Sequence, residues 1–270
     1  MNGLKLISTS SAMPAGVVTN EDLTKIVDTS DEWITSRTGI HIRRRCGEGE
    51  SHTQLCLAAA RQALERSGIS PEEIGVCLVA TFTADHLNPA TACILQKELG
   101  FPEDTVCFDL NAACSGFVYA LHTAQCLLSA APRKFGLVLG ADVLYTPGVN
   151  TGAPSYIHME GQAVFRFAVE TVPRCISQVL EQAGLGVEDV DRFVFHQANQ
   201  RIIDLAMRKL HLPAEKCTGN IAHTGNTSAA SVPLLLDELV SGGALRSGQR
   251  ALCVGFGAGL TWGGALLEVK

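Results

Sequence analysis

The chain has 270 residues, of which 46% are hydrophobic and 18% are charged, and its formal net charge is −6 at pH 7. This composition is typical of a soluble globular protein, and the negative charge argues against broad nucleic-acid binding. No apolar run reaches the roughly 18 residues that a membrane span needs, and the N-terminal stretch 1–23 makes a poor signal peptide.

The ten cysteines are interpreted as free thiols of a reducing compartment. They form no C-x-x-C pair, so a zinc ribbon or a thioredoxin motif is not expected, and we predict no metal site. Most of them stand in apolar runs, where cysteine usually serves as a small buried residue. We therefore expect a cytoplasmic protein in which nine cysteines are structural, and only Cys114 is a candidate for chemistry.

Strand and helix patterns alternate along the chain. The stretch 4–10 predicts a first strand, and 62–79 predicts a helix closed by glycine, an acidic turn and a buried strand. The run 105–110 predicts a strand that leads into a helix after Cys114, and 135–143 predicts another buried strand. This order is typical of βαβ units with a mostly parallel sheet.

The second half of the chain repeats the first. Residues 178–195 align with 62–79 at an offset of 116 without a gap, with identities that include Gly68 and Gly184. Buried runs at 250–259 and 260–269 follow in the later copy. The repeat predicts a duplicated α/β fold with pseudo-twofold symmetry, whose halves are residues 1–145 and 146–270.

The repeat also predicts a shortened segment near 144–160. By symmetry, this region should hold the last strand of the first half and the first strand of the second half. It is instead rich in Gly and Pro and shows little β periodicity. Either each half lacks a strand, or a segment is absent here.

Three reactive residues follow predicted strands: Cys114, His196 and Asn226. Ligands of open α/β sheets bind beyond the carboxyl ends of the strands, so a pseudo-twofold would bring the three together. A helix N-terminus at Cys114 would lower the pKa of its thiol. Taken singly, each residue has an ordinary alternative, as a buried thiol, a core histidine or a turn residue.

Five linked motifs resemble β-ketoacyl-acyl-carrier-protein synthase III, the initiating condensing enzyme of type II fatty-acid synthesis. The motifs are 28–40, 111–117, 196–199, 225–231 and 256–263. The resemblance implies a thiolase-like fold with αβαβα layers. It also implies that Cys114 takes an acyl group from acyl-CoA, with acetyl-CoA the expected donor. His196 and Asn226 would then stabilise the enolate formed from malonyl-acyl-carrier protein, and the backbone N–H groups of Cys114 and Ala258 would form an oxyanion hole.

The resemblance implies further sites and partners. CoA is expected as part of a substrate, with no dissociable cofactor, and the protein is expected to be a homodimer. The residues implied for CoA are Trp33, Arg37, Gly161, Phe165, Asn199 and Arg201. Those implied for the acyl pocket are Asn88, Leu144 and Phe256, and those implied for carrier-protein docking are Arg201, Arg208 and Lys209.

Alternatives remain open at this point. One is a related synthase of secondary metabolism with another starter unit. Another is an inactive, truncated paralogue that binds CoA or a carrier protein. A Cys-His-Asn hydrolase is a weaker hypothesis, because no papain-type signature surrounds Cys114.

Overall fold

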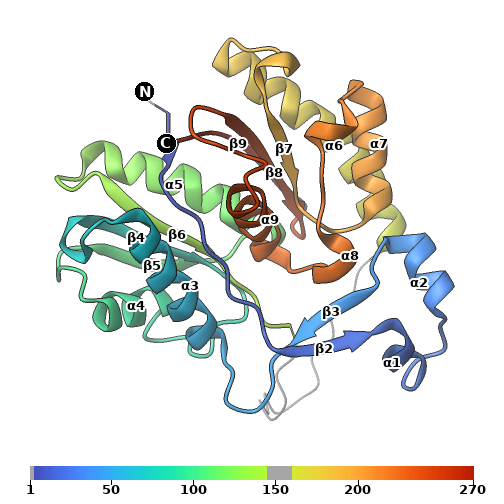
Figure 1. The fold of residues 1–270 in the computed structure, drawn as a ribbon, viewed down its shortest axis with the longest axis horizontal. Helices are drawn as coiled ribbons and strands as arrows, with labels where there is room; N and C mark the ends of the chain where they lie inside the picture. Colours follow the sequence, from blue (N-terminus) through green and yellow to red (C-terminus); the bar gives the residue numbers. More distant parts are fainter. Residues whose placement is uncertain (1–2, 145–159) are drawn as a thin grey trace.

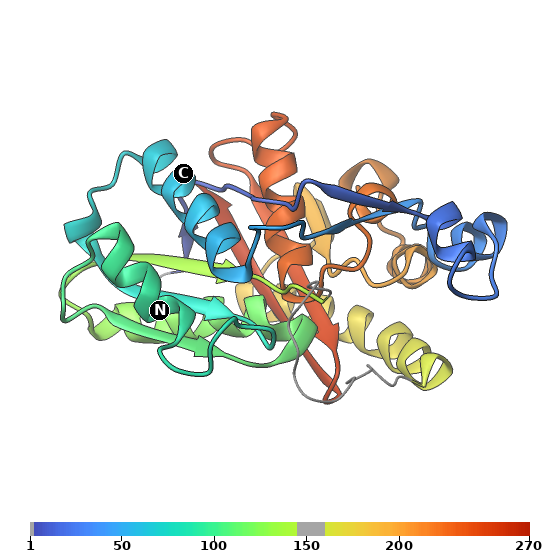
Figure 2. The same ribbon diagram turned by 90° about the horizontal axis from the view of Figure 1, so that it is seen from below.

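The computed structural model describes residues 3–144 and 160–270, which form five layers (Figures 1 and 2). One sheet has the strand order β5-β4-β6 and the other has the order β1-β9-β8-β7. Helices α5 and α9 lie between the two sheets, α3 and α4 cover the first sheet, and α6 and α7 lie on the outer side of the second. The predicted αβαβα architecture is therefore confirmed.

The elements have the following bounds. The strands of the first sheet are β4 (Ile74–Ala80), β5 (Val106–Leu110) and β6 (Phe135–Gly140), and those of the second are β1 (Lys5–Leu6), β7 (Arg192–Phe195), β8 (Arg250–Gly257) and β9 (Thr261–Val269). The layered helices are α3 (His52–Ser67), α4 (Thr91–Leu99), α5 (Gly116–Ala130), α6 (Gly161–Ala183), α7 (Gln200–Leu210) and α9 (Ser231–Ser241). The remaining elements are a ribbon of β2 (Gly16–Thr19) and β3 (Ile42–Arg45), and the short helices α1 (Asn20–Thr24), α2 (Asp31–Thr38) and α8 (Ile221–Thr224).

The internal repeat is visible in the helix ends. Helices α3 and α6 are both capped by a glycine in the left-handed conformation, Gly68 at φ +66° and Gly184 at φ +67°. Each is followed by a short 3-10 turn, at Pro71–Glu73 and Val187–Asp189, and then by a buried strand. Glycine stands at the C-terminal end of each helix because it takes a positive φ without a Cβ penalty.

Helix α5 is buried because it is apolar on both sides. Phe117 and Leu121 pack with residues of the second sheet and α9, whereas Ala120 and Ala124 pack against β4 of the first sheet. Two apolar sides of one helix are both buried only when the helix lies between two layers, and the remaining side of α5 is exposed. The residue that precedes this helix is thereby held between the two sheets.

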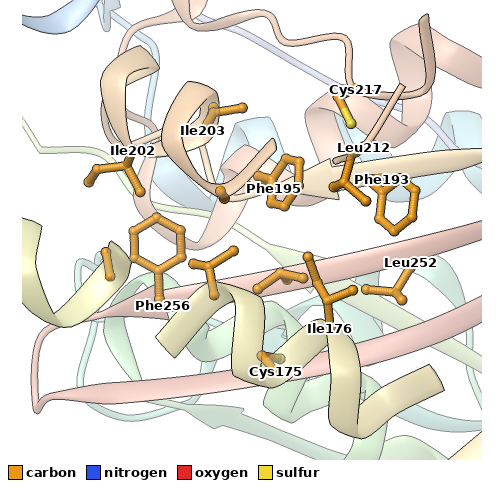
Figure 3. Packing of buried hydrophobic residues seen from close by; sticks show 14 of the residues in the cluster. Cys175, Ile176, Phe193, Phe195, Ile202, Ile203, Leu212, Cys217, Leu252 and Phe256 are labelled. Atoms are coloured by element: carbon orange, nitrogen blue, oxygen red, sulfur yellow. The ribbon is translucent and has the colours of Figure 1, made fainter. Parts of the chain in front are cut away.

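The core of the second half lies between β7, β8, α6 and α7 (Figure 3). Phe193, Phe195 and Phe256 are almost fully buried there, against Ile176 and Leu252. This core sets the position of the strand ends from which His196 and Ala258 emerge.

The first strand is shorter than the sequence predicts. Only Lys5–Leu6 of the stretch 4–10 is a strand, and it pairs in parallel with β9 of the second half. Ser8 and Ser10 instead donate their hydroxyls to the carbonyl oxygens of Ala63 and Ala59 on α3, at 2.8 and 2.6 Å. These side-chain hydrogen bonds hold residues 8–10 against α3, where they form no strand pairing.

The outer edge of β6 differs from that of its counterpart β8. Strand β8 is paired by the antiparallel β9, whereas β6 is paired only with β4 within residues 3–144 and 160–270. A cavity of about 950 Å³ lies beside β6, lined also by the N-terminal segment and by α5. The predicted junction of the halves, and nearly all of the predicted shortened segment, fall at 145–159, outside the described residues.

No helix within those same limits is long and apolar enough to cross a bilayer.

Candidate active site

Cys114 lies in a tight turn between the two sheets. Strand β5 ends at Leu110, a 3-10 turn covers Ala113–Ser115, and α5 begins at Gly116. Ala113 has a φ of +45°, which is uncommon for a residue with a side chain. Backbone strain of this kind tends to gather at functional sites.

Two glycines of β8 let this turn approach the second sheet. A Cβ on Gly257 would stand 2.7 Å from Cβ and 3.2 Å from Sγ of Cys114, and one on Gly255 would stand 3.1 Å from Cα of Ser115. A Cβ cannot come within 3.0 Å of a neighbouring carbon without a shift, so an alanine at Gly257 would displace Cys114. The spacing of two glycines on a buried strand is a sequence signal for close backbone approach.

The surroundings of Cys114 correct one prediction. The helix N-terminus was expected to lower the pKa of its thiol, but burial raises that pKa, and the carboxylate of Asp142 raises it further. Hydrogen bonds from Ser228 and from the backbone act in the opposite direction. Desolvation prevails because the sulfur is largely buried, two residues before α5 begins at Gly116.

A raised pKa has a measurable consequence. We expect the rate of Cys114 alkylation by iodoacetamide to rise about tenfold per pH unit from pH 6 to 9, because only the thiolate reacts. The rate would be followed by mass spectrometry of the peptide that contains Cys114, so that the exposed Cys126 does not contribute. A plateau below pH 8 would mean that the helix N-terminus prevails after all.

His196 follows β7 and is almost completely buried. Its backbone N–H donates to the carbonyl oxygen of Val254 at 2.8 Å, and its imidazole ring meets Phe256 edge-on, with centroids 5.2 Å apart. Burial lowers the pKa of the imidazole to about 3, so the ring is neutral at neutral pH. Nδ1 is buried with no hydrogen-bond partner among the described residues. A neutral imidazole here can donate a hydrogen bond without carrying charge.

Gln197 ties the histidine loop to the loop that leads to Asn226. Its amide nitrogen donates to the carbonyl oxygen of Phe195 at 2.8 Å, and its amide oxygen accepts from the N–H groups of Asn220 and Ile221 at 3.1 and 3.2 Å. The side chain is fully buried. The polar residues after β7 therefore have partners, as buried polar groups require.

Asn226 follows α8 and is exposed, with its side-chain oxygen accepting from the N–H of Ser228 at 2.9 Å. Gly225 before it has a φ of +70°, and a Cβ there would stand 3.1 Å from Cβ of Arg43 on β3. Ser228 in turn lies 3.5 Å from the sulfur of Cys114, measured from Oγ to Sγ. Asn226 and Cys114 are thus joined through one intervening residue.

A chain of contacts connects the three reactive residues predicted from the sequence. Cys114 packs on Gly257, the residue after the phenylalanine that holds His196, while Ser228 joins Cys114 to Asn226. Ala258 follows Gly257 and is exposed, and its carbonyl oxygen accepts from the hydroxyl of Thr261 at 2.9 Å. The hydroxyl oxygen of Thr261 also lies 2.9 Å from that of Ser115, so Thr261 connects this loop to the turn of Cys114.

Trp33 and Arg37 lie one helical turn apart on α2, which projects from one end of the molecule (Figures 1 and 2). The side chain of Trp33 is 57% exposed, so it is free for a flat partner rather than part of the core. Asn199, the N-cap of α7, donates to the carbonyl oxygen of Arg37 at 2.8 Å. Gly39 ends α2 and allows contact with Gln200.

Arg201 and Phe165 pair across α7 and α6. The guanidinium carbon of Arg201 lies 5.5 Å from the centroid of the Phe165 ring, a cation–π distance. Gly161 is exposed at the start of α6. Because α2 and α6 both contact α7, the residues predicted for CoA lie at one side of the molecule.

A buried asparagine that the sequence analysis missed fastens α2 in place. The side-chain nitrogen of Asn20 donates to Asp31 at 2.7 Å and to the carbonyl oxygen of Ile40 at 2.8 Å, and its oxygen accepts from Arg43 at 2.6 Å. Asn20 is 2% exposed. It thereby links α2 to β3, which also contacts Gly225. From the sequence alone, a polar residue at the start of a short helix does not indicate that it will hold α2 and β3 together.

Replacing Asn20 by leucine is expected to lower the free energy of unfolding by about 2–4 kcal/mol, because Asp31 and Arg43 would lose a buried partner. Urea denaturation measures the loss. The matched control is Asn88→Leu, at an exposed position, for which the change should stay within about 0.5 kcal/mol. Equal stabilities for the two variants would contradict the prediction.

The three residues predicted for the acyl pocket have different surroundings. Phe256 is buried against His196, whereas Leu144 is 49% exposed in the loop after β6 and lines the cavity beside that strand. Asn88 is exposed on the loop after β4. Of these three residues, only Phe256 has a described contact with His196.

The residues predicted for carrier-protein docking are all exposed on α7. Arg201 and Arg208 are seven residues apart, close to two helical turns, and so lie along one side of the helix. Lys209 donates to the carbonyl oxygen of Val169 on α6 at 3.2 Å.

Comparison with known proteins agrees with this geometry. Residues 180–269 match the family described as 3-oxoacyl-[acyl-carrier-protein] synthase III C terminal, and residues 108–159 match 3-oxoacyl-[acyl-carrier-protein] synthase III. A β-ketoacyl-[acyl-carrier-protein] synthase III of Clostridium acetobutylicum is 39% identical over 324 residues, covering 99% of both chains. That alignment is at least 54 positions longer than this chain of 270 residues.

Solved structures show the same similarity. The crystal structure of 3-oxoacyl-[acyl-carrier-protein] synthase III from Aquifex aeolicus has a TM-score of 0.90 and 38% identity, covering 98% of this chain and all of that one. A priming β-ketosynthase from the R1128 polyketide biosynthetic pathway has a TM-score of 0.87 and 30% identity, covering 99% and 98%. The chain therefore belongs to the β-ketoacyl-acyl-carrier-protein synthase III family of condensing acyltransferases.

Proposed function

We propose that this protein catalyses the initiating condensation of type II fatty-acid synthesis, with Cys114, His196 and Asn226 as its catalytic residues. An acyl-CoA first acylates Cys114, and malonyl-acyl-carrier protein then condenses with the acyl group to give 3-oxoacyl-acyl-carrier protein. The observation that carries the proposal is the junction of the two halves, where the turn of Cys114 contacts both Gly257 and Ser228.

In the first step the sulfur of Cys114 attacks the thioester carbonyl of acyl-CoA. A bond from the carbonyl carbon to Sγ forms, the bond to the sulfur of CoA breaks, and the cysteine proton ends on the released CoA. The N–H groups of Cys114 and Ala258 are proposed to hold the oxyanion. The close approach of Gly257 to Cys114 supports this pairing, because Ala258 is the next residue. Donors aimed at a developing oxyanion are worth several kcal/mol.

In the second step His196 and Asn226 are proposed to donate to the thioester carbonyl of the malonyl group. As CO2 leaves, the electron pair of the broken C–C bond forms an enolate, which attacks the acyl-Cys114 carbonyl and expels the sulfur. The neutral state of His196 and the hydrogen bond on the oxygen of Asn226 support this role, since both leave donors free of charge.

CoA is proposed to bind along α2, α7 and the start of α6. Exposed Trp33 offers a flat face for adenine, and Arg37 offers a cation for a phosphate. Gly161, Phe165, Asn199 and Arg201 are proposed to line the path of the pantetheine. Arg201, Arg208 and Lys209 are proposed to dock the acidic carrier protein. Asn88, Leu144 and Phe256 are proposed for the acyl pocket, and we assign no dissociable cofactor.

The oligomeric state, the domain boundaries and the cellular location of the protein are also proposals. We propose a homodimer, supported by the edge position of β5 and the exposed Val106 on it. We propose halves at 1–145 and 146–270, supported by the repeat of α3 and β4 in α6 and β7. A cytoplasmic location is proposed because all ten cysteines are free.

Incubation with acetyl-CoA and then malonyl-acyl-carrier protein tests the proposal. Intact-protein mass spectrometry should show one acetyl group on the enzyme and 3-oxobutyryl-acyl-carrier protein as product. Transfer from longer acyl-CoAs but not from acetyl-CoA would mean that the starter unit is not acetyl and would favour a synthase of secondary metabolism. The similarity to the priming β-ketosynthase supports that alternative. A folded protein that accepts no acyl-CoA would instead be an inactive paralogue that binds CoA or carrier protein.

A further inference from the structure

Ser228 is a buried hydroxyl that the reaction described above does not use. It begins the 3-10 turn Ser228–Ala230 that precedes α9, and it is 3% exposed. Its φ of +51° is costly for a residue with a side chain. A strained, buried polar residue beside a reactive sulfur calls for an explanation.

The turn of Ser228 is the internal-repeat counterpart of the turn of Cys114. In the first half, the N–H of Ala113 donates to the side-chain oxygen of Asn111 at 3.2 Å. In the second half, the N–H of Ser228 donates to that of Asn226 at 2.9 Å. Ala113 and Ser228 are 115 residues apart, both have positive φ, and both turns lead into a central helix. The two turns pack against each other.

Two contacts define what Ser228 can do. Its hydroxyl oxygen lies 3.5 Å from the sulfur of Cys114, within hydrogen-bonding distance for sulfur. Its backbone N–H donates to the side-chain oxygen of Asn226, so the NH2 group of the same amide is the end that can donate to a substrate. One residue thus touches both the nucleophile and the amide proposed for the second step.

The strained turn is held from the first half. The N–H of Ala229 donates to Asp142 at 3.2 Å, and Asp142 also accepts from the N–H of Phe82 at 3.0 Å. Gly140 allows the approach, because a Cβ there would stand 2.3 Å from the carbonyl oxygen of Ala229. These contacts fix the position of Ser228 independently of its hydroxyl, so the hydroxyl is available to the sulfur.

We propose that Ser228 is a catalytic residue of the acylation step, donating its hydroxyl to the Cys114 thiolate while its N–H orients Asn226. The inference rests on the proposed function. Ser228 remains neutral throughout, because the proton of the thiol ends on the released CoA. Once the sulfur carries an acyl group it is a weaker acceptor, so the hydroxyl acts on acylation rather than on condensation.

Two variants separate the hydroxyl from the backbone. Ser228→Ala removes the hydroxyl and keeps the strain of a side chain at positive φ, whereas Ser228→Gly removes the hydroxyl and relieves that strain. Both keep the N–H that holds Asn226. We expect both variants to alkylate with iodoacetamide at Cys114 about tenfold more slowly at pH 8, because a hydrogen bond to a charged group is lost. The pH profile of alkylation should move to higher pH in both.

Acyl transfer gives the second readout. Acylation by acetyl-CoA should slow by a similar factor, while condensation started from enzyme acetylated in advance should keep the wild-type rate. Alkylation uses no acyl substrate, so it tests the contact with Ser228 even if the proposed function fails. Wild-type alkylation rates at every pH in both folded variants would overturn the inference, as would a loss confined to condensation.

Discussion

Cys114→Ser is expected to abolish acyl transfer, with no acetyl group on the intact protein after incubation with acetyl-CoA. A serine hydroxyl at the same buried position is a far weaker nucleophile than a thiolate. Loss of a nucleophile typically costs on the order of 10³-fold or more in rate. Intact-protein mass spectrometry of the wild type and the variant, in parallel, measures the difference.

Cys126→Ser is the matched control. Cys126 lies on α5 as well, but it is exposed and far along the helix from the turn of Cys114. It is the thiol most open to slow chemical acylation from solution. Its variant should acquire one acetyl group at the wild-type rate. If acylation followed Cys126 instead, the adduct would be a surface modification and Cys114 would not be the nucleophile.

The fold could be predicted in large part because its signals are local. Gly68 and Gly184 close helices at equivalent places, and the buried strands β4, β7 and β8 read as short apolar runs. The repeat then required two similar halves. The length of the first strand was overestimated, because Ser8 and Ser10 form hydrogen bonds to α3. The hydrophobic pattern of the sequence does not indicate such bonds.

The site was predicted less completely. The sequence placed Cys114, His196 and Asn226 at strand ends, and contacts in the structure join the loops that carry them. It predicted the wrong direction for the pKa shift of Cys114, because desolvation depends on how two segments far apart in the sequence close around the sulfur. Asn20 and Ser228 were missed for the same reason, since each acts through partners far along the chain or through an unusual backbone angle.

His196→Ala is expected to separate the two half-reactions. Acylation of Cys114 should stay within a few-fold of the wild-type rate, while condensation with malonyl-acyl-carrier protein should fall by about 10²–10³-fold, the usual cost of one lost oxyanion donor. His196→Gln should recover part of the rate, because burial holds the native ring neutral and a glutamine amide is also a neutral donor. Single-turnover assays on enzyme acetylated in advance isolate the second step.

The pH dependence of that step distinguishes a neutral donor from a cation. Burial lowers the pKa of His196 to about 3, so the ring is uncharged at every pH above that value, and condensation should show no inflection near pH 6.5. Asn226→Asp supplies the matched test at the other donor: the carboxylate keeps the shape and can accept from Ser228, but it cannot donate, so condensation should fall as far as in Asn226→Ala. The opposite result would be a condensation rate that increases as the pH falls through about 6.5, together with full activity of Asn226→Asp. It would mean that charge rather than hydrogen-bond donation stabilises the enolate.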